Sequence, residues 1–212
     1  MNRLFSDRSE AGRALAQQLA RLELRAPVVL ALPRGGVPVA AEIARELKAP
    51  LDLVLVRKIG VPWQPELAVA AIVDGTHPEL VIDEEVKQEA GVDQGYIEAE
   101  AKRQLVELER RRRVYLSGRL PIPLLGRTAI VVDDGIATGT TMRAALKALR
   151  RRSPAEVVLA VPVAPRETIE ALRELVDRVV CLAQPEPFYA IGLHYGDFHQ
   201  FEDEEVIAAL SA

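Results

Sequence analysis

Short runs of consecutive apolar residues alternate with segments of helical periodicity along most of the 212-residue chain. Because these runs are apolar at nearly every position, they predict strands that are buried on both faces of a sheet. The predicted strands cover residues 27–32, 51–56, 67–73, 129–132, 157–161 and 178–182. The predicted helices are an opening helix capped near Ser9 and helices over residues 39–47, 141–152 and 166–175. This alternation predicts an α/β fold with a mostly parallel sheet and helices on both faces.

One long segment interrupts the alternation. Residues 93–117 favour helix, and four apolar residues recur along one side of it: Ile97, Ala101, Leu105 and Leu108. We therefore predict a single domain over residues 1–212 that contains an inserted helical arm over residues 75–120. A further C-terminal segment, residues 183–212, follows the last predicted strand.

Composition narrows the classes of function. The formal charge of -4 and the pI near 5.6 argue against a nucleic-acid-binding protein. The single cysteine, Cys181, cannot form an internal disulfide, and no apolar stretch approaches the length of a membrane span. A cytoplasmic protein without a membrane role is expected. The single Asn, two Met and one Cys, with 22 Arg against 5 Lys, suggest a heat-adapted source, although genome composition would explain the Arg enrichment equally well.

The strand predicted at residues 129–132 ends abruptly in two carboxylates, Asp133 and Asp134, and a turn of mostly small residues then leads into a helix. Small side chains and the free N–H groups of the first helical turn suit a phosphate group. The residues of this predicted phosphate cradle are Ala137, Thr138, Gly139, Thr140 and Thr141. The two carboxylates, the acid pair, would then accept hydrogen bonds from neutral hydroxyl groups, such as those of a ribose. In the simpler alternative, one Asp caps the helix and the glycines only form a turn.

Two other phosphate-binding motifs are excluded by spacing. Only three residues separate Gly135 from Gly139 and no Lys-Ser/Thr pair follows, so the segment is not a P-loop. The glycines after the first predicted strand, Gly35 and Gly36, do not form the G-x-G-x-x-G fingerprint of dinucleotide binding.

The segment from Thr128 or Ala129 to Thr141 resembles the thirteen-residue ribose-phosphate motif of type I phosphoribosyltransferases. This resemblance implies a doubly wound fold with a small C-terminal hood. It also implies transfer of the phosphoribosyl group from 5-phosphoribosyl-1-pyrophosphate (PRPP) to a nucleobase-like acceptor, with release of pyrophosphate. Mg²⁺ would be held through PRPP near Asp133 and Asp134, without direct protein ligands. A homo-oligomer, most simply a dimer, and a role in nucleotide salvage are expected.

The family resemblance also suggests a pyrophosphate site. Arg34, Gly35 and Gly36 are similar to the family's pyrophosphate loop, in which a strained or cis non-proline peptide directs backbone N–H groups at the leaving group. Arg57 and Lys58 follow the second predicted strand, where the family places a basic contact, and Lys58 is the favoured catalytic partner of the acid pair. The alternatives are a plain Gly-Gly turn and a solvated basic pair.

The accepting base is not identified. Ala137 stands where hypoxanthine-guanine members carry an Asp, which makes ordinary 6-oxopurine salvage less favoured. Phe188 is the candidate for stacking on the base, although a small hydrophobic cluster would explain it equally well. Trp63 could belong to a closing loop or fill a packing gap. A PRPP sensor without turnover and a hydrolase of phosphoribosyl compounds are the alternative functions.

Overall fold

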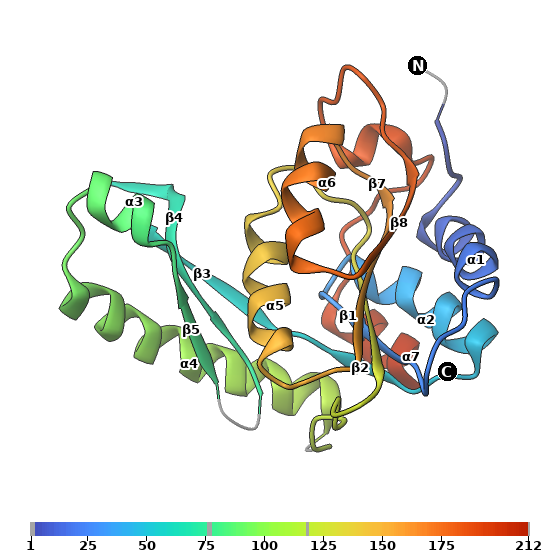
Figure 1. Ribbon diagram of the computed structural model, residues 1–212, viewed down its shortest axis with the longest axis horizontal. Helices are drawn as coiled ribbons and strands as arrows, with labels where there is room; N and C mark the ends of the chain where they lie inside the picture. Colours follow the sequence, from blue (N-terminus) through green and yellow to red (C-terminus); the bar gives the residue numbers. More distant parts are fainter. Residues whose placement is uncertain (1–2, 76–77, 118, 212) are drawn as a thin grey trace.

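The computed structural model describes residues 3–75, 78–117 and 119–211. Its core is a five-stranded, fully parallel sheet in the order β2-β1-β6-β7-β8 (Figure 1). The strands are β1 (Val28–Ala31), β2 (Leu51–Leu53), β6 (Thr128–Val132), β7 (Glu156–Val163) and β8 (Arg178–Ala183). The predicted α/β class and parallel sheet are confirmed.

Helices cover both faces of this sheet because the apolar side chains of each strand alternate between two cores. Val29 of β1 packs with α1 (Arg8–Leu19) and α2 (Gly36–Leu47). Leu30 packs on the opposite face with α5 (Thr140–Arg150) and α6 (Arg166–Leu172), which the short helix η1 (Arg173–Leu175) extends. The predicted cap at Ser9 is wrong, because the Asp7 side chain caps α1 by accepting a hydrogen bond from the backbone N–H of Glu10.

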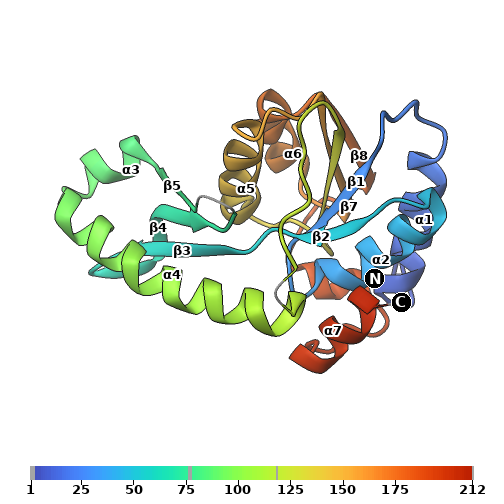
Figure 2. The same cartoon turned by 90° about the horizontal axis from the view of Figure 1, so that it is seen from below.

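A second, antiparallel sheet forms an arm beside the core (Figures 1 and 2). It consists of β3 (Val56–Val61), β4 (Gln64–Val73) and β5 (Glu79–Ile82), followed by α3 (Glu84–Glu89) and α4 (Gln94–Leu116). The predicted strand 51–56 is split between β2 and β3, and the predicted strand 67–73 belongs to the arm rather than to the parallel sheet. The reason is that the arm sheet packs between α4 and α5, so its strands are as apolar there as core strands.

The C-terminal segment returns to the core. After β8 it forms η2 (Ile191–His194) and then α7 (Asp203–Ser211), which packs against α2 and α4. Val206 is fully buried in that contact. The division into one domain, an arm over 75–120 and a hood over 183–212 remains a prediction, and residues 76–77, 118 and 212 of those ranges lie outside the described residues. Within the described part of the chain, no helix is both long and apolar enough to cross a membrane.

Candidate active site

The loop between β6 and α5 contains the predicted phosphate cradle. Gly139 is the N-cap residue of α5 and has a left-handed backbone (φ 76°), a conformation that favours glycine. A Cβ on Gly139 would also lie 2.9 Å from Thr168 Cγ2. No side chain caps α5, which leaves the N–H groups of its first turn without a side-chain acceptor. Thr168 of α6 supports the loop by donating a hydrogen bond to the carbonyl of Ala137 (2.7 Å).

Two hydroxyl groups of the cradle lie close together. The Oγ1 atoms of Thr138 and Thr140 are 3.4 Å apart, and Ala137 and Thr138 are exposed. Thr140 and Thr141 form the first turn of α5. The five cradle residues therefore lie together in the loop and first turn at the positive end of a helix dipole, where an anion is stabilised.

The two carboxylates of the acid pair differ in their surroundings. Asp134 is buried, and its Oδ2 accepts a hydrogen bond from Arg8 Nε at 2.7 Å. Asp133 is half-buried; its Oδ1 accepts the backbone N–H of Asp134 (2.9 Å), and its carboxyl group also interacts with the Asp134 side chain. Burial raises the pKa of both carboxyls, an effect that the Asp134 charge reinforces at Asp133 and that Arg8 opposes at Asp134. Asp133 is thus the less buried carboxyl of the pair and, among the described residues, the one without a salt bridge.

The glycine loop after β1 lies directly against the acid pair. β1 and β6 are neighbouring parallel strands, so the loops at their carboxyl ends meet. A Cβ on Gly35 would clash with the carboxylate of Asp134, and a Cβ on Gly36 would lie 2.9 Å from Asp133 Cα. Only glycine at these positions permits this approach. The peptide between Pro33 and Arg34 is cis, which confirms the predicted geometry.

The Arg34 side chain points toward the C-terminal segment. Its Nη1 lies 3.4 Å from Glu202 Oε2 and 3.9 Å from Asp203 Oδ1, and about a quarter of the side chain is exposed (28%). Both acidic partners are more exposed than Arg34. Such solvated contacts are weak, so a bound anion could compete for this guanidinium.

The basic pair lies elsewhere than expected. Arg57 and Lys58 do not end a strand of the parallel sheet, because the chain leaves that sheet at Leu53 and both residues lie within β3 of the arm. Arg57 Nε donates to Gln104 of α4 (3.0 Å), whereas the exposed side chain of Lys58 has no hydrogen bond or ion pair among the described residues. Trp63 is two-thirds exposed at the turn between β3 and β4, which contradicts its alternative role as a packing residue.

The C-terminal segment covers part of the motif. Ile191 packs over Gly135, and the Tyr195 hydroxyl donates to the backbone carbonyl of Asp134 (2.5 Å). Phe188 is partly buried against this cluster, with its ring centroid 5.4 Å from that of His194, and it also borders a surface hollow at Pro165. The structure therefore brings the cradle, acid pair and glycine loop together and leaves Lys58 on the arm.

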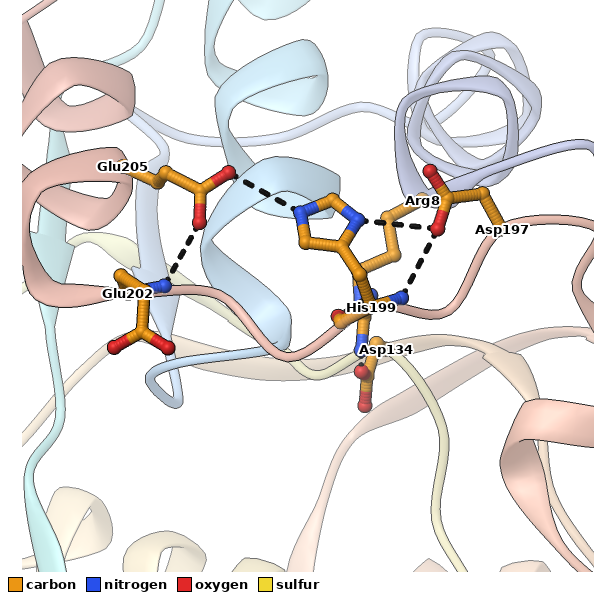
Figure 3. A network of polar contacts seen from close by, with 6 residues as sticks. All are labelled: Arg8, Asp134, Asp197, His199, Glu202 and Glu205. Atoms are coloured by element: carbon orange, nitrogen blue, oxygen red, sulfur yellow. Dashed lines mark hydrogen bonds and ion pairs between the residues drawn. The ribbon is translucent and has the colours of Figure 1, made fainter.

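Arg8 is the residue of this site that the sequence interpretation missed. It is buried although it is an arginine, and Figure 3 shows its side chain reaching Asp134 beside the C-terminal segment. A signal was present in the sequence. Arg8 lies three, four and seven residues before Ala11, Gly12 and Leu15, which form the buried face of α1. A charged residue on that face requires a buried partner.

The comparisons with known proteins agree with this geometry. The family model described as "Phosphoribosyl transferase domain" matches residues 7–195. Two proteins of Mycobacterium tuberculosis strains CDC 1551 and H37Rv, each named "Putative phosphoribosyl transferase", are 49% identical over 208 residues, 98% of this chain and 46% of each relative. The chain therefore spans about half the length of the curated relatives it matches.

Two solved structures are similar. The crystal structure of TT1426 from Thermus thermophilus is 47% identical, covers 97% of both chains and has a TM-score of 0.86. The AQ2163 protein from Aquifex aeolicus is 13% identical, with a TM-score of 0.51 over 82% of this chain and 73% of its own, and this similarity concerns the fold alone.

Proposed function

Because the chain belongs to the phosphoribosyl transferase domain family, and its site resembles that of the type I members, we propose that it transfers the 5-phosphoribosyl group of PRPP to a nitrogenous base and releases pyrophosphate. The observation that carries this proposal is the contact between two loops. The glycine loop after β1 packs on the acid pair at the end of β6, immediately before the phosphate cradle. A molecule with a phosphate at one end and a pyrophosphate at the other would span these loops.

In this arrangement the cradle holds the 5′-phosphate. The backbone N–H groups at the start of α5 and the hydroxyls of Thr138, Thr140 and Thr141 would donate to its oxygens. Asp133, the less buried carboxyl of the pair, would accept hydrogen bonds from the ribose hydroxyls. These contacts fix the sugar so that its C1 faces the glycine loop, and orientation of this kind supplies a large part of catalysis between two substrates.

The leaving group would meet donors from two parts of the chain. Gly35 lies against the acid pair and would direct its backbone N–H at the leaving group, whereas the Gly36 N–H already donates to the carbonyl of Leu32 (3.1 Å) and Gly36 permits the close approach of the loop to Asp133. Arg34 adds a cation at the same loop. Arg57 and Lys58 would contribute from the arm, where the exposed Lys58 side chain makes no hydrogen bond or ion pair with the described residues. Positive groups around pyrophosphate stabilise the charge that develops as its bond to C1 breaks.

Mg²⁺ fits this site as an ion held mainly by the substrate. Mg²⁺ prefers oxygen ligands and retains several waters, often with substrate phosphates in its shell. The described residues contain no group of three or more His, Cys, Asp or Glu side chains that could hold a metal. Asp133 and Asp134 would therefore lie near a Mg²⁺ ion that is carried by the substrate, and the chemistry that such an ion supplies is stabilisation of negative charge.

The acceptor is proposed to be a nucleobase-like ring, in nucleotide salvage or related metabolism, in a cytoplasmic dimer. Phe188 supports this choice weakly, because it is a partly buried aromatic residue in the C-terminal segment that covers the motif. Ala137 supports an acceptor other than an ordinary 6-oxopurine, since a methyl group cannot assist proton transfer at the ring.

The test is release of pyrophosphate from PRPP with Mg²⁺ in the presence of single bases. We expect release only when one of a panel of purines, pyrimidines and orotate is added. Release without any base would instead indicate a hydrolase. Calorimetric binding of PRPP without any release would indicate a sensor, and absence of both binding and release would contradict the proposal.

A further inference from the structure

Arg8 is a buried cation at the back of the acid pair. Only 6% of the residue is exposed, and it enters the site from α1, more than a hundred residues before the motif. Its Nε donates to Asp134 Oδ2 (2.7 Å) and its Nη1 donates to the carbonyl of His199 (3.0 Å). The guanidinium thus joins the first helix, the acid pair and the C-terminal segment (Figure 3).

Aromatic rings enclose the same guanidinium. Arg8 Cζ lies 3.9 Å from the ring centroid of Phe198 and 5.4 Å from that of Phe201. A cation over an aromatic face is attracted by the ring, more strongly when water is excluded. Phe198 in turn stacks on Tyr195, whose hydroxyl holds the backbone of Asp134. The aromatic rings therefore help to hold the orientation of Arg8 in addition to its two hydrogen bonds.

We propose that Arg8 is a positioning residue, which holds the Asp134 carboxylate against the glycine loop and thereby aligns Asp133 with the ribose hydroxyls of PRPP. Asp134 is connected to both loops. Its backbone N–H donates to Asp133 Oδ1, and its carboxylate fills the space where Gly35 would carry a Cβ. The inference rests on the proposed function. The alternative is that the Arg8–Asp134 pair contributes to the fold alone.

The test is a double-mutant cycle read by calorimetric binding of PRPP with Mg²⁺. Arg8→Met removes the charge and keeps much of the apolar stem, Asp134→Asn removes the other charge, and the double variant removes both. We expect Arg8→Met to weaken PRPP about tenfold, within the coupling range of contacting residues. The double variant should bind within about twofold of Asp134→Asn, because Arg8 acts through Asp134.

Two further variants separate positioning from general stability. Arg8→Lys retains the charge, but its single ammonium group cannot reproduce the fork of donors that reaches both Asp134 and the His199 carbonyl, so we expect it to recover only part of the affinity lost in Arg8→Met. Arg13→Met is the matched control, because Arg13 lies on the same helix with a largely exposed side chain that pairs with Glu42, and its loss should not alter PRPP binding. Melting temperatures identify any variant that fails to fold. If Arg8→Met fails to fold, the PRPP affinities of Arg8→Lys and of the double variant still distinguish positioning from general stability.

The outcomes are distinct. A folded Arg8→Met that binds PRPP as the parent does, or losses that multiply in the double variant, would overturn the role of Arg8 and leave the proposed function intact. A parent protein that does not bind PRPP overturns both.

Discussion

The carboxyl edge of the parallel sheet and the arm use different physical means to present polar groups. At the sheet edge, β1 and β6 are buried at every position, and the loops after them are held by backbone contacts, as where Gly36 meets Asp133. On the arm, β3 and β5 are partly exposed, and the candidate residue Lys58 extends from the strand as a free side chain. The edge presents polar groups from closely packed loops, whereas the arm presents an exposed charge.

The base of the arm nevertheless has a firm connection to the core. Asp74, at the end of β4, is buried, accepts the backbone N–H of Leu55 (2.8 Å) and pairs with Arg112 of α4. The arm sheet is therefore anchored near the core and exposed further out. A substitution at the sheet edge should therefore change the positions of the ligand-binding loops. A substitution on the outer arm should only remove a charge near the ligand.

The largest effect is expected at Gly139. Gly139→Val places a β-branched side chain at a left-handed position and against Thr168, which should deform the cradle and weaken PRPP at least about 100-fold, or roughly 2.7 kcal/mol. Gly91→Val is the matched control on the arm. Gly91 has a similar backbone (φ 61°) but nothing within 4 Å of a Cβ, so PRPP affinity should be unchanged there. Calorimetry of both variants checks this; equal losses would mean that the cradle is misplaced.

The acid pair should show an effect of similar size on the rate. Asp133→Asn keeps the size of the side chain but removes the charge beside the proposed ribose, and we expect kcat to fall about 100-fold, roughly 2.7 kcal/mol, with a smaller change in PRPP affinity. Asp93→Asn makes the same change on the arm. Asp93 caps α4, where Asn is an equally good cap, so the rate should be retained. Single-turnover rates with an accepted base measure both, and parent-like turnover of Asp133→Asn would exclude it from the site.

The sequence predicted parts of both regions. At the sheet edge, a fully apolar run ending in Asp133 and Asp134 allowed the strand, the loop and the start of α5 to be predicted within a residue or two. In the arm, α4 was predicted because its apolar residues recur at helical spacing, as at Ile97 and Leu108. Both predictions rest on local signals: the short length of an apolar run that ends in a turn, and the helical period of a long segment.

The errors have physical causes. The run at residues 51–56 crosses from β2 into β3 because Val54 and Leu55 remain buried while the chain changes sheets, so hydrophobicity alone does not show the break. The strand β4 packs between α4 and α5 and resembles a core strand for the same reason. Arg8 was missed because its partner Asp134 is distant in the sequence, and pairing across such a distance depends on the fold.

A smaller effect should distinguish Arg34 from Lys58. Arg34→Ala and Lys58→Ala each remove one cation proposed to contact the leaving group, and each should weaken inhibition by pyrophosphate about tenfold, near 1.5 kcal/mol for a hydrogen bond to a charged group. Lys102→Ala, an exposed charge on α4, is the control and should leave the inhibition constant unchanged. If the pyrophosphate inhibition constant is unchanged in Lys58→Ala but raised in Arg34→Ala, pyrophosphate is bound by the sheet edge and not by Lys58 of the arm.

The smallest effect concerns the stability of the arm. Hydrogen bonds from Arg110 and Arg111 lower the pKa of Glu107 in α4 to about 2. Because the folded pKa lies below the ordinary value of 4.5, these contacts stabilise the fold above about pH 4.5, and the stabilisation is lost as the pH falls toward 2. The pairs are solvated and worth roughly 0.5 kcal/mol.

Urea unfolding of Glu107→Gln should therefore give a free energy of unfolding that is lower than that of the parent by about this amount at pH 7 and low salt, and this difference is the deficit. That deficit should vanish near pH 2 or in 1 M salt, because screening weakens exposed pairs. A deficit that persists under both conditions would mean that Glu107 contributes by packing rather than by charge.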